Sequence, residues 1–136
     1  MDAIRERGRT GPISVRFMRF GATCSLAAAV IHFRVAPEHL REFWLFGVVF
    51  VVMGLAQAVW AFLSIGRVTR AILVVGVLGN AALVLIWIVS RTVGLPVGPE
   101  AWMAEPIGML DVLSTLLEGI VVGVSALLLR ERSTFG

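Results

Sequence analysis

Four long apolar segments dominate this sequence and limit the folds that it can adopt. Charged residues or prolines bound each of them, and they cover residues 15–35, 43–66, 71–90 and 107–129. Each is close to the ~20 residues that an α-helix needs to cross the hydrocarbon core of a bilayer. Backbone polar groups in lipid must be bonded within their own segment, so the many Val and Ile residues do not argue for strands. We therefore expect four transmembrane helices.

The composition points to the same class of protein. Of 136 residues, 58% are hydrophobic and 15% are charged, which is too apolar for a soluble domain with so small an interior. The prediction is an all-α, multi-pass protein of the inner or plasma membrane, with the lipid bilayer as a partner. An antiparallel four-helix bundle would occupy residues 15–130, between cytoplasmic tails at 1–14 and 131–136.

The basic residues indicate an orientation in the membrane. All twelve are arginines. Nine fall on one side of the four segments: Arg5, Arg7, Arg9, Arg16, Arg19, Arg67, Arg70, Arg130 and Arg132. Arg34, Arg41 and Arg91 fall on the other. The positive-inside rule then places both termini and the 67–70 turn in the cytoplasm. Because this distribution follows membrane topology, a nucleic-acid partner is not expected.

Prolines and short connections predict where the helices end. Pro37 is expected to end the first helix and Pro106 to begin the fourth. The extracytoplasmic loops would then lie at 36–42 and 91–106. The link at 66–70 is so short that the second and third helices should be antiparallel neighbours.

Small and polar residues recur at spacings of three and four along each segment, which marks the face that packs against other helices. The four stripes are Gly21, Ser25, Ala28 and His32; Gly47, Phe50, Gly54, Gln57, Ala61 and Ser64; Gly76, Asn80, Leu83, Trp87 and Ser90; and Gly108, Asp111, Thr115, Glu118, Val122 and Ser125. From the helical rise per residue, His32 and Asp111 should form an upper polar layer near the outer surface. Gln57, Asn80 and Glu118 should form a lower layer near the midplane.

Ionisable residues inside a membrane are costly, so the upper layer is a candidate site. Histidine together with carboxylates suits a transition metal such as Zn, Cu or Fe. The candidate metal or ligand residues are His32, Asp111, Glu38, His39 and Glu105. No spacing among them matches a specific metal motif, and the alternative is a structural hydrogen bond between His32 and Asp111.

The lower layer has two interpretations. Glu118 could carry protons through the membrane interior, or it could join Gln57 and Asn80 in hydrogen bonds that hold the helices together. Both remain open from the sequence.

Other features bear on the function classes. Cys24 is the only cysteine, so an intrachain disulfide is excluded, and we interpret it as a small packing residue. Trp44 and Trp102 are predicted anchors at the membrane interface, the latter within an apolar loop at 92–106. The sequence contains no Walker loop, dinucleotide glycine fingerprint, nucleophile elbow or zincin helix. An enzyme is therefore not expected.

Four spans and a membrane-embedded glutamate resemble the small multidrug resistance transporters in architecture. The essential glutamate of that family lies in its first helix, where this chain has His32, so no residue role is carried over. Three functions stay open. The lack of motifs favours an accessory or assembly protein that packs against a larger membrane complex or against itself. The alternatives are a metal- or cofactor-binding protein that uses the upper layer, and an oligomeric proton-coupled transporter that uses Glu118.

Overall fold

The computed structural model describes residues 11–134, and this part of the chain is built from helices without any strand. The helices are α1 (Pro12–Glu42), α2 (Trp44–Gly66), α3 (Arg70–Thr92) and α4 (Met109–Thr134). All four are long and apolar enough to cross a membrane, which confirms the predicted all-α class and indicates a membrane protein. Residues 1–10 and 135–136 of the two predicted tails lie outside the described residues.

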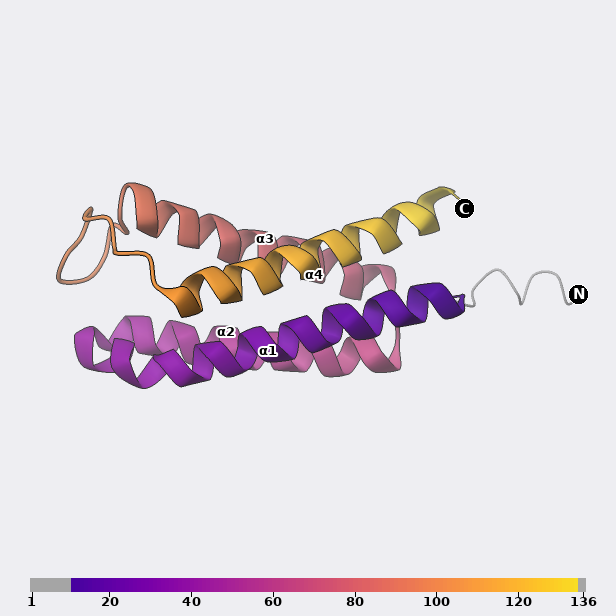
Figure 1. Cartoon of the computed structure of the whole chain (residues 1–136), viewed down its shortest axis with the longest axis horizontal. Coiled ribbons are helices and arrows are strands. Elements are labelled where there is room, and N and C mark those ends of the chain that lie inside the picture. Colours follow the sequence, from indigo (N-terminus) through magenta and orange to yellow (C-terminus); the bar gives the residue numbers. More distant parts are fainter. Residues whose placement is uncertain (1–10, 135–136) are drawn as a thin grey trace, which may run out of the picture.

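The helices run antiparallel in chain order. Figure 1 shows α1 beginning, α4 ending and the α2–α3 link lying at one end of the bundle, which we call the terminal end. The α1–α2 turn and the connection between α3 and α4 lie at the other, which we call the loop end. This arrangement agrees with the predicted order of crossings.

The packing of the helices differs from the prediction for α2 and α3. The main contacts join α1 with α2, α3 with α4, and α1 with α4, whereas α2 and α3 share few. The link at 67–69 holds them together at the terminal end, and they separate toward the loop end (Figure 1). They are antiparallel, as predicted, but they are neighbours mainly near the link. A short link brings together only the ends that it connects.

The first helix does not end at Pro37 as predicted, because α1 continues to Glu42. A proline inside a helix removes one backbone hydrogen bond, and this part of α1 packs closely against α2. Ala36 is buried, and a Cβ atom on Gly47 would lie 2.0 Å from Cγ of Leu40, so the two backbones approach closely. The predicted loop at 36–42 is therefore helical, and Phe43 alone is extended between the two helices.

The predicted stripes mark the buried faces of α1, α2 and α3. Gly21, Ser25, Ala28 and His32 are all buried, and so are most members of the stripes on α2 and α3. On α4 the buried face is rotated from the prediction. It contains Ser114, Glu118, Val121, Ser125 and Leu128, while Gly108 is exposed and Asp111 is half-buried.

The terminal half of the bundle has a packed core. Met18 and Ala22 of α1 meet Val121 and Leu128 of α4, with Trp60 and Leu73 in the same cluster. The indole nitrogen of Trp60 donates to the carbonyl of Ile72 at 2.8 Å, which fastens α2 to α3 near their link. In the loop half no such core joins α2 to α3, and a cavity lies there.

Candidate functional site: a cavity within the helix bundle

One polar residue from each helix meets its partners in the middle of the bundle. His32, Gln57, Asn80 and Glu118 are each 2–5% exposed, and we call them the central polar cluster. Nε2 of His32 lies 3.0 Å from Oε1 of Glu118. The amide nitrogen of Gln57 donates to the same oxygen at 3.1 Å and to Oδ1 of Asn80 at 3.5 Å. Asn80 in turn donates to the carbonyl of Gly76 at 3.0 Å.

This cluster corrects the predicted division into two polar layers. His32 contacts Glu118 of the lower layer and not Asp111. The predicted layers assume that all four helices are parallel to one another and begin at equivalent depths in the membrane. In the structure Asp111 lies in the first turn of α4, where its carboxylate accepts from the backbone N–H of Gly108 at 3.0 Å. Glu118 lies two turns further along the same helix, level with His32.

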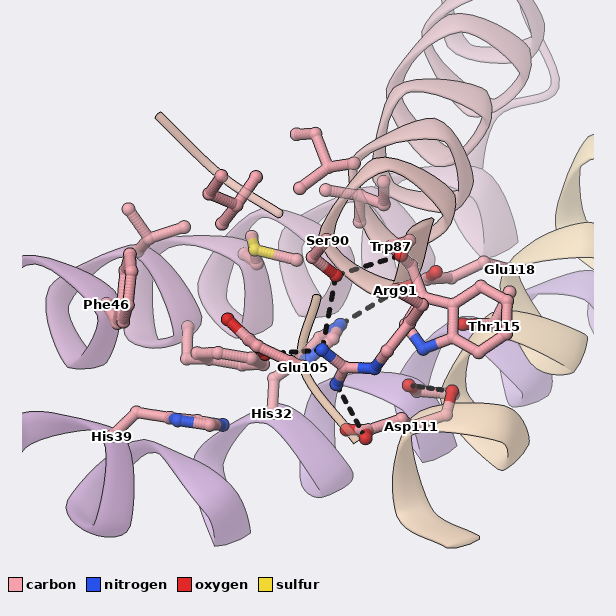
Figure 2. A pocket seen from close by; sticks show the side chains of 17 residues that line it. His32, His39, Phe46, Trp87, Ser90, Arg91, Glu105, Asp111, Thr115 and Glu118 are labelled. Carbon is pink, nitrogen blue, oxygen red and sulfur yellow. Dashed lines mark hydrogen bonds and ion pairs between the residues drawn. The ribbon is translucent and has the colours of Figure 1, made fainter. Parts of the chain in front are cut away.

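Asp111 has a different partner, which the sequence analysis did not identify. The guanidinium of Arg91 donates to Asp111 at 2.7 Å and also to Glu105. Its side chain is 9% exposed, and Figure 2 shows it reaching between the two carboxylates. We call Arg91, Glu105 and Asp111 the Arg91 clasp. A buried arginine needs carboxylate partners of this kind, because an unpaired charge is costly to bury.

The connection between α3 and α4 positions Glu105, one of the two carboxylates of the Arg91 clasp. The backbone N–H of Glu105 donates to the carbonyl of Ser90 at 2.9 Å, and that of Trp102 donates to Leu95 at 2.8 Å. Gly94 has φ +78°, and a Cβ atom there would lie 2.4 Å from the carbonyl oxygen of Met103. The connection thus folds back onto the end of α3 and carries Glu105 to Arg91.

A cavity lies in the loop half, where α2 and α3 separate, and all four helices contribute to its walls. It has about 660 Å³ of empty space, including the part that is open to its surroundings. His32 and Glu118 line it together with the Arg91 clasp. The other lining side chains are largely apolar or aromatic and include Phe46, Phe50, Met53, Leu83 and Trp87. Figure 2 shows how the polar members lie within it.

A second, more open recess adjoins this cavity at the loop end. The two spaces share His39, Phe46 and the residues of the clasp. Three further carboxylates line the recess: Glu38, Glu42 and Glu100. The cavity therefore lies beneath an acidic recess, with the Arg91 clasp at the boundary.

The five residues predicted for a metal or ligand site divide among different contacts. His32 belongs to the central polar cluster, while Glu105 and Asp111 belong to the clasp. His39 stacks on Phe50 with ring centroids 4.3 Å apart, and its Nδ1 lies 2.9 Å from Glu42. Glu38 lines the recess. From residue 11 to residue 134, no group of three or more His, Cys, Asp or Glu side chains is arranged to hold a metal ion.

The predicted interface anchors lie at the loop end. The side chains of Trp44 and Trp102 are 63% and 68% exposed, as a residue in contact with lipid headgroups would be. Their role as anchors stays a prediction.

Comparison with known proteins gives no further assignment. No protein-family model, curated protein or solved structure matches this chain.

Proposed function

We propose that this protein binds a small, largely apolar molecule in the cavity of the loop half. The observation that carries the proposal is the pairing of an open, mostly apolar cavity with a fully buried His32–Glu118 contact in its wall. Ligand sites commonly have this composition, with apolar and aromatic walls and a few placed polar groups.

A purely structural account of the cavity is less satisfactory. Interiors are packed with few voids larger than a water molecule, and membrane helices associate through close packing. The terminal half of this bundle follows that rule. The loop half departs from it where the ionisable residues lie, which supports a binding role for that half.

The proposal includes the membrane in which the protein lies and the orientation of the chain in that membrane. The arginines of the described chain that lie near the terminal end include Arg16, Arg67, Arg70 and Arg132. By the positive-inside rule this end faces the cytoplasm of a cell whose inner or plasma membrane holds the protein. The cavity and its acidic recess then open toward the extracytoplasmic side, and the packed terminal half closes them toward the cytoplasm.

Binding can be tested with two aromatic probes of one skeleton, 2-methylnaphthalene and 2-methyl-1,4-naphthoquinone. The full chain in lipid nanodiscs is equilibrated with each probe, and protein-free nanodiscs report lipid partitioning. We expect saturable binding of at least one probe at one site per chain. Leu83→Trp, which places an indole in the cavity, should abolish it.

Leu85→Trp is the matched control, because Leu85 lies on the same helix, is 60% exposed and does not line the cavity. This variant should bind as the parent does. If neither probe binds saturably to the parent chain, or if both variants bind alike, the proposal is wrong.

A specific observation also favours the assembly function predicted from the sequence. Gly119 and Gly123 are exposed on α4, four residues apart, and a Cβ atom on either would meet nothing within 4 Å. Glycines at this spacing allow two membrane helices to pack closely. Gly21 and Gly76, by contrast, already face neighbouring helices within the chain. We propose α4 as the contact face for a second copy of the chain or for another membrane helix.

Crosslinking in membranes tests the assembly proposal. Substitution of both Gly119 and Gly123 by leucine should reduce a crosslinked dimer or hetero-complex by at least about tenfold, since close helix approach is lost. Gly79→Leu is the control, because Gly79 is also exposed, on α3, and a Cβ atom there would meet nothing within 4 Å. Equal crosslinking of all three proteins would contradict an α4 interface.

A further inference from the structure

Hydrogen-bonding groups without partners reveal what kind of ligand the cavity would accept. Among the described residues, five buried side-chain atoms have no hydrogen-bond partner: Nδ1 of His32, Oε1 of Gln57, Nε1 of Trp87, Nε of Arg91 and Oγ of Ser125. His32, Trp87 and Arg91 line the cavity. Buried polar groups are nearly always satisfied, so three such groups around one cavity point to a bound molecule.

Two of these three groups can act only as donors. The indole N–H of Trp87 and the guanidinium Nε–H of Arg91 have no acceptor capacity. They lie four residues apart on α3, which places them on one face of the helix. Figure 2 shows both side chains among those that surround the cavity. A molecule that satisfies them must present acceptor oxygens or nitrogens.

Three hydroxyl groups line the cavity, and that of Thr115 can act as a donor or as an acceptor toward a ligand. The other two do not change this balance. Ser90 donates to the carbonyl of Trp87 at 2.8 Å, and Ser114 donates to the carbonyl of Asp111 at 3.0 Å. Their hydrogens are therefore used within their own helices. The amide of Gln57 is likewise directed to Glu118 and Asn80.

The charges of the cavity argue against an anionic ligand. Arg91 is its one arginine, and both terminal nitrogens of this guanidinium already bond to the carboxylates of Glu105 and Asp111. An anion would have to displace one of them or lie beside an acidic recess. The unsatisfied donors therefore suit neutral acceptors such as carbonyl oxygens.

The side chains that line the cavity indicate the shape and polarity of the rest of the ligand. Phe46, Phe50 and Trp87 give the cavity aromatic surfaces, and aliphatic side chains such as Leu83 and Val49 complete it. Flat rings pack favourably against such side chains. Because α2 and α3 separate at this level, an apolar substituent on the ring could extend between them.

We propose, on the basis of the proposed ligand-binding function, that the cavity takes a neutral, ring-shaped lipophilic molecule with carbonyl oxygens, the chemistry of quinones and cyclic ketones. The indole N–H of Trp87 and the Nε–H of Arg91, which neighbouring atoms cover, turn toward the ligand and donate to its oxygens. The ring packs between the aromatic side chains, and His32 with Glu118 borders its inner side.

The two probes named above separate this proposal from the function on which it rests. They share one ring skeleton and differ in the two carbonyl oxygens of the quinone. The measurements use a Cys24→Ala background, because quinones add to thiols. After correction for partitioning into protein-free nanodiscs, the quinone should bind at least about tenfold more tightly than the hydrocarbon.

Removing one donor should reduce this preference. Trp87→Phe keeps an aromatic ring and deletes the N–H, so it should weaken quinone binding about fivefold, the value of one net hydrogen bond. Hydrocarbon binding should not change. Trp44→Phe, at an exposed tryptophan that does not line the cavity, should leave both affinities as they were.

Each other outcome has a distinct meaning. Equal affinities for the two probes would overturn the carbonyl proposal and leave the ligand-binding function standing. Tighter binding of 1-naphthylmethylammonium than of the quinone would also overturn it, because the cavity would then select cations. Absence of saturable binding for every probe would overturn both proposals.

Discussion

At the scale of single residues, the part of the chain from residue 11 to residue 134 contains two His–Glu pairs of similar geometry in opposite environments. His32 and Glu118 lie 3.0 Å apart with both side chains 3% exposed, whereas His39 and Glu42 lie 2.9 Å apart at the loop end and are more open. Polar and ionic contacts gain strength where water is absent, but each partner also becomes costly to leave alone. The two pairs therefore form an internal comparison.

A double-mutant cycle should separate the two pairs. Replacing His32 and Glu118 singly and together by alanine should give a coupling energy of about 1–3 kcal/mol in the free energy of unfolding. The His39–Glu42 cycle should give about 0.5 kcal/mol or less, the value of an exposed pair on one helix. Reversible unfolding in mixed micelles measures both.

Equal coupling energies for the two cycles would contradict a specific buried contact between His32 and Glu118. Glu118→Gln is the conservative control, because an amide can still accept from Gln57 and His32 while it carries no charge. It should lose less stability than Glu118→Ala.

Much of the residue-scale site follows from the sequence, and the errors concern partners. The residues of the central polar cluster were all identified from their positions on the stripes. The pairing of His32 with Asp111 was wrong, because depth along a helix depends on where that helix starts and how it tilts. Arg91 was treated only as a topology signal. The carboxylates of Glu105 and Asp111 lie 14 and 20 residues after Arg91 in the sequence, and they are the features from which the clasp could have been predicted.

At the scale of elements, close approach of helices depends on individual glycines. On α3, a Cβ atom at Gly76 would lie 2.5 Å from Oγ of Ser125 and 2.6 Å from the indole of Trp60, while one at Gly79 would meet nothing within 4 Å. The same residue type thus occupies a packed position and an open position one turn apart.

Alanine at these two positions should give opposite results. Gly76→Ala should lower the free energy of unfolding by about 1–3 kcal/mol, because overpacking forces the helices apart. Gly79→Ala should leave it unchanged or slightly raised, since alanine favours the helix. Unfolding midpoints in one detergent mixture measure the difference, and equal midpoints would contradict the close α2–α3–α4 contact.

The connection between α3 and α4 offers a second test at this scale. Glu105→Gln removes the charge that Arg91 contacts, so backbone amides between residues 94 and 105 should exchange with deuterium several-fold faster. Glu100→Gln is the control, because Glu100 lies on the same connection but outside the clasp. Unchanged exchange in Glu105→Gln would mean that the backbone contacts with Ser90 and Leu95 suffice to hold the connection.

The elements themselves were predicted well, and their ends less well. Apolar length located all four helices, but it could not show that α1 passes through Pro37. Beyond this proline, Leu40 packs closely against Gly47 of α2, a tertiary contact that apolar length does not reveal. The rotation of the buried face on α4 has a similar origin, because the spacing of small and polar residues along one segment contains no information about contacts with the other helices.

At the scale of the whole molecule, the bundle has two unlike halves. The terminal half is packed through the core of Trp60 and Leu73, and the loop half contains the cavity and recess. The sequence predicted an antiparallel bundle with an inward polar face. It could not predict the cavity, because the distance between α2 and α3 is set by side chains from all four helices.

Membrane orientation can be tested on the complete chain. In a Cys24→Ala background, Glu100→Cys at the loop end should react with a membrane-impermeant maleimide in intact cells. Arg67→Cys at the terminal end should react only after lysis. This result follows from the positive-inside rule, and the reverse pattern would place the cavity mouth in the cytoplasm.

The separation between α2 and α3 increases from the 67–69 link toward the loop end, so each helix can act as a lever about that link. Both helices have 23 residues and are therefore about 35 Å long. With the 67–69 link as pivot, one degree of rotation moves the far end of either helix by roughly 0.6 Å, a simple result of that length. Helix tilt responds to bilayer thickness. If these helices cross a bilayer, we therefore expect the spacing of the cavity walls to change with the thickness of that bilayer.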